Sequence, residues 1–267
     1  MSRGRPAEGV PEAGARGKRR SGGLWEQIST LAVAVLIALA IRAFVVEPYR
    51  IPSGSMFPTL LIGDHLFVNK FVYSIKIPFT RLRLPGLREP ERGDVVVFTV
   101  ARRGPQTLPA DRNPELPTEE FVKRIVGIPG DRLEFREGKL WVNGEPVEPR
   151  PLAEPFEDEL GRRLGVAEVS VDGRSFRVLD DPEISLREPE PLSVPPGRYF
   201  MLGDNRDHSK DSRFWGTVDE ADLKGPALIL YWSWDFNDSW AKLLNPLTWW
   251  ELLTQKMRWE RTGDVVR

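Results

Sequence analysis

The stretch FVKRIVGIPGD, residues 121–131, decides the kind of fold that this chain can adopt. Apart from Lys123, Arg124 and one glycine, its first eight residues are aliphatic or aromatic, so they predict a buried β-strand. The following Pro-Gly-Asp ends the strand in a turn. Because side chains alternate along a strand, Lys123 shares one face with Phe121 and Ile125, while Arg124 lies on the opposite face.

Two adjacent cations inside an apolar strand are costly unless each has a purpose. Burial disfavours the charged form of lysine and lowers its pKa by up to several units from about 10.4. Arginine stays charged in proteins and cannot act as a base. Lys123 is therefore a candidate general base and Arg124 a candidate structural cation. The alternative for Lys123 is a lysine on an edge strand that prevents aggregation.

Strand patterns continue on both sides of this stretch and predict a mainly β fold. The candidate strands are residues 64–73, 75–84, 95–100, 133–135, 139–142, 166–171, 174–179, 198–202 and 227–234. We expect a catalytic β domain formed by residues 47–138 and 196–235. Residues 139–195, rich in Pro, Glu and Arg, would form a smaller β insertion subdomain.

The N-terminal part of the chain predicts a membrane anchor. Residues 1–23 are rich in Gly, Pro and Arg and are expected to be a disordered basic tail. Residues 24–46 would form one transmembrane helix, roughly 34 Å long at 1.5 Å per residue. Basic residues cluster only before this helix, which puts the tail in the cytoplasm and residues 47–267 outside. The alternative is a cleaved signal peptide with its cleavage site at 38–40.

The opposite end, residues 236–267, is rich in tryptophan and has apolar residues at helical spacing, interrupted by Pro246. This pattern predicts an amphipathic tail. It suits a helix that lies at a membrane interface, where indole rings concentrate. It suits equally a helix that packs on the protein's own core.

The segment PSGSMFPT, residues 52–59, places Ser55 in a turn shortly after the apolar run. Serine is a weak nucleophile unless a nearby base takes its proton. Lys123 is one candidate base. His208 is the other, with Asp204, Asp207 or Asp211 to orient it, although a histidine in so polar a loop is more often a turn residue.

A third segment, GDNRDHSKDSR at residues 203–213, alternates acids, amides, hydroxyls and arginines. It predicts a buried polar network in which Asp211 forms a bidentate pair with Arg213 or Arg206. The alternative is a solvated loop of the calcium-binding kind. Arg206 and Lys210 in the middle of the segment argue against that alternative.

The composition removes several classes of function. The 267 residues include no cysteine, which excludes disulfides, thiolate catalysis and zinc–thiolate sites. The net charge of −1 gives no reason to expect a nucleic-acid partner. The two histidines fall in no metal-binding spacing, and no phosphate-binding glycine motif occurs. We expect neither a cofactor nor a metal.

With these three segments in this order, residues 25–235 resemble the bacterial type I signal peptidases, also called leader peptidases. These are Ser/Lys endopeptidases anchored in the cytoplasmic (inner) membrane. The resemblance implies an antiparallel β catalytic domain with a smaller β insertion. It also implies that Ser55 is the nucleophile and Lys123 the general base. The Ser53 hydroxyl and the Ser55 backbone N–H would form the oxyanion hole.

The resemblance further implies that the chain removes signal peptides from exported preproteins at the outer face of the membrane. Small side chains would precede the cut. The residues that would support the dyad are Arg124, Asp204, Arg206, Ser209, Asp211 and Arg213, with Ser209 orienting the Lys123 ammonium. Some members have two transmembrane segments, whereas this sequence shows one.

Two other classes of protein remain open from the sequence. One is a Ser/Lys autoprotease of the SOS-repressor type, which would need a DNA-binding helix-turn-helix where this chain has an apolar run. The other is a non-enzymatic, membrane-anchored β domain that only binds partners.

Overall fold

The structure is a computed structural model that describes residues 24–76, 83–181, 183–184, 188–235, 250–251, 254 and 256–267. It divides into two compact units, residues 1–40 and residues 41–267. The expected basic tail, residues 1–23, lies outside the described residues.

Helix α1 (Leu24–Phe44) contains the apolar run. Within the described ranges, it is the helix that is long and apolar enough to cross a membrane, with a mean hydropathy of 1.5 over Trp25–Arg42. None of that window is buried inside the protein. A helix that is apolar on all sides and uncovered by protein is typical of a membrane span.

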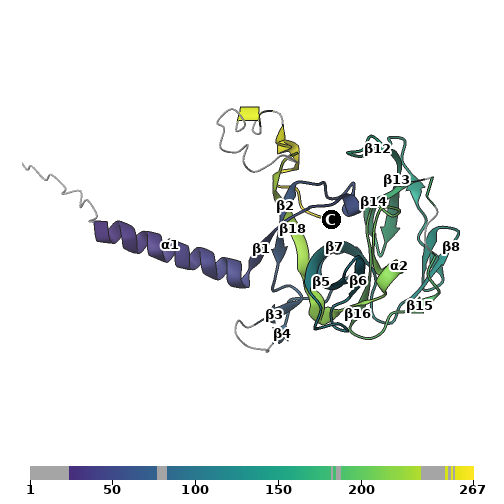
Figure 1. Cartoon of the computed structure of the whole chain (residues 1–267), viewed down its shortest axis with the longest axis horizontal. Helices are drawn as coiled ribbons and strands as arrows, with labels where there is room; N and C mark the ends of the chain where they lie inside the picture. Colours follow the sequence, from purple (N-terminus) through teal and green to yellow (C-terminus); the bar gives the residue numbers. More distant parts are fainter. Residues whose placement is uncertain are drawn as a thin grey trace, which may run out of the picture. The chain divides into compact units, whose positions relative to one another are not determined.

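The main sheet has the strand order β1-β2-β18-β5-β7-β16-β17, with β6 paired to β5 (Figure 1). Every pairing in it is antiparallel, which confirms the predicted mainly β, antiparallel fold. Its strands are β1 (Val46–Arg50), β2 (Asp64–Asn69), β5 (Val95–Arg103), β6 (Gln106–Pro109), β7 (Thr118–Gly127), β16 (Arg198–Leu202), β17 (Val218–Asp219) and β18 (Leu223–Ser233).

Strand β5 lies at the centre of this sheet because both of its faces are apolar. Val96 and Phe98 pack into one hydrophobic cluster, and Val95 and Val97 pack into another on the opposite face. Strand β7 pairs with β5 over residues 118–124 but with β16 only over residues 124–127. Among the described strands, none pairs with the other edge of residues 118–123.

Two smaller sheets follow in the chain. One has the order β10-β9-β8-β15 and the other contains β11 to β14. Their strands are β8 (Arg132–Arg136), β9 (Lys139–Val142), β10 (Glu145–Pro146), β11 (Arg150–Pro151), β12 (Phe156–Glu157), β13 (Arg163–Val171), β14 (Arg174–Asp180) and β15 (Leu192–Ser193). The division into a catalytic domain and an insertion remains a prediction. However, β8, which the sequence assigned to the catalytic part, pairs with β9 of the insertion.

The remaining elements are short. Strands β3 (Ser74–Lys76) and β4 (Arg83–Pro85) pair as a hairpin, and residues 77–82 between them lie outside the described part. The helical turns are η1 (Gly54–Met56), α2 (Ser212–Trp215), η2 (Glu220–Asp222) and η5 (Trp259–Arg261). Most of the expected tryptophan-rich helix, residues 236–249, is also outside the description.

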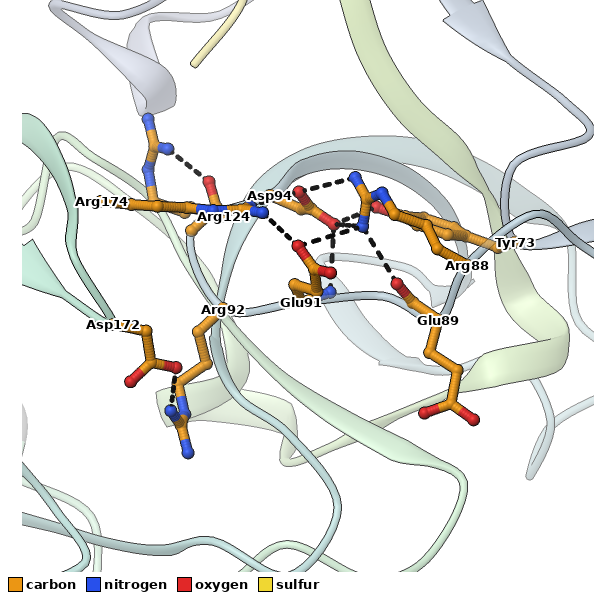
Figure 2. A network of polar contacts seen from close by, with 10 residues as sticks. Tyr73, Arg88, Glu89, Glu91, Arg92, Asp94, Arg124, Asp172 and Arg174 are labelled. Carbon is orange, nitrogen blue, oxygen red and sulfur yellow. Dashed lines mark hydrogen bonds and ion pairs between the residues drawn. The ribbon is translucent and has the colours of Figure 1, made fainter.

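A buried carboxylate, Asp94, joins three parts of the second unit at the start of β5 (Figure 2). It accepts hydrogen bonds from the Tyr73 hydroxyl at 2.7 Å, from Arg88 at 2.7 and 3.0 Å, and from Arg174 of β14 at 2.8 Å. Burial alone would raise the pKa of Asp94, but the hydrogen bonds from Arg88 and Tyr73 outweigh it and hold the pKa below its ordinary value. The backbone carbonyl of the preceding residue, Gly93, accepts a hydrogen bond from Arg124.

Candidate active site

The turn at residues 52–60, here named the nucleophile turn after the predicted role of Ser55, follows β1 and is held by its apolar members. Met56 and Leu60 are buried in the cluster formed with Ile51. Gly54 precedes the serine because a Cβ atom there would lie 2.5 Å from the Phe57 ring. Ser55, in the turn η1, is half-buried and lies in the chain between the buried residues Ile51 and Met56.

Lys123 Nζ donates a hydrogen bond to Ser55 Oγ at 2.6 Å and another to the Val122 carbonyl at 3.0 Å. The lysine is only 3% exposed. The structure thus brings together the two residues that the sequence predicted as nucleophile and base, 68 positions apart in the chain.

Burial lowers the pKa of Lys123 from its ordinary value to about 8. The carboxylates of Asp211 and Asp204 act in the opposite direction, and Arg213 adds to the lowering. With a pKa near 8, about a tenth of the molecules carry a neutral lysine at pH 7. A neutral amine in contact with a serine hydroxyl is what nucleophilic activation needs.

Ser53 lies next to this pair. Its hydroxyl oxygen is 3.5 Å from Ser55 Oγ, and its side chain is exposed toward solvent. A hydroxyl at this position can reach an oxygen that develops negative charge on a carbonyl attacked by Ser55.

Behind the dyad, Arg124 and Asp204 form a fully buried ion pair. Arg124 Nε and Nη2 donate to the two carboxylate oxygens of Asp204 at 2.8 and 2.7 Å. The same carboxylate accepts from the Thr59 hydroxyl at 2.6 Å, and Arg124 Nη1 donates to the Gly93 carbonyl at 2.6 Å. The pair therefore joins β7, the nucleophile turn and the 203–213 loop, and loss of one partner would leave a buried charge unpaired.

Two residues of the 203–213 loop contact the backbone of the turn directly. Asn205 donates from its side chain to the Gly54 carbonyl at 3.0 Å and from its backbone to the Ser55 carbonyl at 3.2 Å. A Cβ atom on Gly203 would lie 2.5 Å from the Ser55 carbonyl oxygen. The only signal for Asn205 and Gly203 in the sequence is their place within the segment at residues 203–213.

Asp211 and Arg213 form the predicted bidentate pair, with two bonds of 2.8 Å, and Asp211 also caps α2. Arg213 further donates to the Arg206 carbonyl. Burial lowers the pKa of Arg206 to about 10, and its Nε has no hydrogen-bond partner in the described part of the chain. Arg206 thus contributes its backbone, whereas its guanidinium is not bonded to Asp211.

Ser209 lies beside the site without the expected contact. Its side chain is buried against Gly203, and its hydroxyl has no hydrogen-bond partner among the described residues. The prediction that Ser209 orients the Lys123 ammonium remains a prediction.

His208 faces other partners than the triad alternative requires. Its Nε2 lies 2.9 Å from an Asp181 carboxylate oxygen, and its Nδ1 lies 3.3 Å from Arg162. The Ser55 hydroxyl is in contact with Lys123 instead. His65 lies on β2 beside the rings of Tyr231 and Trp234.

A cleft of about 830 Å³ opens over the dyad. Ser55 and Lys123 line it together with the end of β1, residues 119–122 of β7 and the turn at residues 158–162. The unpaired edge of β7 borders this cleft. A free strand edge beside a nucleophile can take an extended peptide as an added strand.

Comparisons with known proteins place the chain in a family. A family model described as "Signal peptidase, peptidase S26" matches residues 24–232. A signal peptidase I from Pseudomonas aeruginosa is 36% identical over 217 residues, which cover 75% of this chain and 69% of the relative. One from Aquifex aeolicus is 32% identical over 256 residues, 84% of this chain and 90% of the relative. A solved signal peptidase I from Enterococcus faecalis, 30% identical, covers 52% of this chain and 97% of that chain with a TM-score of 0.29.

Proposed function

Because this chain belongs to the signal peptidase family, peptidase S26, we propose that it removes signal peptides through a Ser55 nucleophile and a Lys123 general base. The function of a type I signal peptidase follows from the family, and its substrates are preproteins that carry signal peptides. The observation that supports the dyad is the 2.6 Å contact between Ser55 Oγ and a buried Lys123 Nζ.

The reaction would begin when neutral Lys123 takes the Ser55 proton while Oγ attacks the carbonyl carbon of the last signal-peptide residue. The Ser53 hydroxyl and the Ser55 backbone N–H would stabilise the oxyanion. The Lys123 ammonium would then give its proton to the leaving amine, and the mature protein would depart. A water molecule, deprotonated by Lys123, would hydrolyse the serine ester and restore the Ser55 hydroxyl.

The substrate would bind as an extended strand along the free edge of β7 at residues 118–122. Pairing between the substrate and β7 would end at Arg124, because β16 pairs with β7 from that residue onward. Arg124 is next to Lys123 of the dyad. The scissile bond would therefore lie beside Ser55. By the family resemblance, small side chains would occupy the positions before the cut.

The function is tested by incubating the purified full chain in detergent with a preprotein and determining the product masses. The expected result is a single cut at the end of the signal peptide. The matched control is the same preprotein with a tryptophan in place of the small residue before the cut, which should stay intact. A cut at another position, or equal cleavage of both substrates, would contradict the proposal.

The pH dependence follows from the pKa of Lys123. Only the neutral amine accepts a proton, so activity is lost as the pH falls below the pKa of about 8. We expect kcat/KM to rise about tenfold per pH unit below that value and to level off above it. The measurement is an initial-rate profile at substrate concentrations well below KM. A profile that stays flat across pH 8 would refute Lys123 as the base.

The membrane orientation is a proposal of its own. Helix α1 would anchor the chain once, with the basic tail in the cytoplasm and residues 47–267 outside. Anchoring enzyme and substrate in one bilayer would also raise their effective concentration. Protease added to spheroplasts should then digest the catalytic part and leave the tail protected. If digestion of the catalytic part requires lysis, the orientation is inverted.

A further inference from the structure

The segment Lys256–Arg267 follows the residues that the family model matches, yet it returns to the nucleophile turn. It runs along β18, where Met257 bridges to Trp234 and Val265 bridges to Ile229. Backbone hydrogen bonds of 2.7 to 2.9 Å join residues 263–266 to residues 228–230. Backbone pairing therefore adds the segment to β18 of the main sheet.

Arg261 is the main contact between this segment and the turn. Its Nη2 donates to the Thr59 carbonyl at 3.0 Å and to Asp64 Oδ2 at 2.6 Å, while its Nε lies 3.3 Å from Asp64 Oδ1. Asp64 is fully buried and also accepts from the Leu61 backbone at 2.8 Å and from the Ser233 hydroxyl at 2.6 Å. One guanidinium thus holds both ends of residues 59–64.

Three further contacts join the same segment to the turn and to residues next to it. Arg258 Nη1 donates to the Ile62 carbonyl at 2.9 Å. Val266 packs against the hydrophobic cluster that contains Met56 and Leu60. The Arg267 carbonyl accepts from Arg124 Nη2 at 3.1 Å.

These contacts involve residues that also hold the turn around Ser55 in place. Thr59, held through its carbonyl by Arg261, donates its hydroxyl to Asp204. Met56 adjoins the nucleophile. Since a displacement of about 1 Å at a reacting group costs on the order of 100-fold in rate, the fixation of this turn bears directly on turnover.

We propose that the segment Lys256–Arg267 positions the nucleophile turn, with Arg261 as its principal positioning residue. The inference rests on the proposed Ser55 chemistry. The Arg261 side chain bonds to Thr59 and Asp64, and neither of these residues lines the cleft that would bind peptide. Loss of the Arg261 side chain should therefore change turnover and leave substrate binding nearly unaltered.

The test compares Arg261→Gln with Glu260→Gln in the full chain, because Glu260 is an exposed neighbour. For Arg261→Gln we expect kcat to fall about 10- to 100-fold while KM stays within about twofold. Arg261→Lys keeps the charge but cannot make both contacts as a fork, so it should give an intermediate kcat. Glu260→Gln should match the wild type in both constants.

A double variant separates positioning from buried charge. Arg261→Gln leaves the Asp64 carboxylate buried without this partner and should lower Tm. In Asp64→Asn/Arg261→Gln that charge is removed, so Tm should recover while kcat remains low. Recovery of kcat together with Tm, or an unchanged kcat in the folded single variant, would overturn the proposal. If Arg261→Gln does not fold, the same comparison is made with the double variant and Arg261→Lys.

Amide hydrogen exchange supplies a readout that does not depend on cleavage. Peptides that cover residues 54–61 should exchange faster in Arg261→Gln and in the double variant, but not in Glu260→Gln. Equal exchange in all of these chains would overturn the positioning role. If the wild-type chain cleaved no preprotein, the proposed function would fail, while exchange would still report on the turn.

Discussion

Both Ser55→Ala and Lys123→Arg are expected to reduce preprotein cleavage by on the order of 10⁴- to 10⁶-fold, because a weak nucleophile and its base act as one unit. The arginine variant is the more informative of the two. It keeps a cation at the position where Nζ lies 2.6 Å from Ser55 Oγ, but guanidinium cannot take a proton near neutral pH. Single-turnover rates measured with the same preprotein give the size of the loss.

The matched control for this experiment is His208→Gln, because His208 lines the same cleft but is paired with Asp181 and Arg162. It should keep cleavage within a few-fold of the wild type. Activity of several per cent in folded Lys123→Arg would exclude lysine as the base. A large loss in folded His208→Gln would restore the histidine alternative.

The second large effect is expected for Ser53→Ala. The hydroxyl that lies 3.5 Å from Ser55 Oγ would donate to the oxyanion only once that charge has developed. Its removal should lower kcat by about 100- to 1000-fold, which corresponds to roughly 3–4 kcal/mol of transition-state stabilisation. KM should change little, because an exposed serine contributes little to binding of the ground state.

Ser53→Thr serves as the control, since it keeps a hydroxyl at this position and should retain much of the activity. An unchanged kcat in Ser53→Ala would show that Ser53 only shapes the turn. Equal losses in the alanine and threonine variants would point to packing of the turn rather than to hydrogen bonding.

The contact between Ser55 and Lys123 could be anticipated from the sequence because each residue departs from its setting. Lys123 is a cation among apolar strand residues, and Ser55 lies in a turn rich in Gly and Pro. Such local conflicts between residue type and environment tend to mark functional sites. The antiparallel main sheet could be predicted for a related reason, since period-two patterns and turns carry strand information within a few residues.

The groups that complete the site depend on long-range contacts that no local pattern encodes. Thr59 reaches Asp204 across 145 positions, and Asn205 reaches Gly54 across 151. Arg261 reaches Asp64 across 197. The pairing of β8 with β9 crosses the expected domain boundary at residue 138, and that division remains a prediction.

The proposed binding of preproteins along residues 118–122 of β7, an edge that no described strand pairs with, has a consequence for secreted proteins. Hydrogen bonds along a strand edge are made to peptide groups, which are identical in every preprotein. A recognition surface of this kind tolerates wide sequence divergence among preproteins. Each preprotein only needs an extended backbone and small side chains at the cleavage site. New exported proteins could then arise without any matching change in the enzyme that releases them.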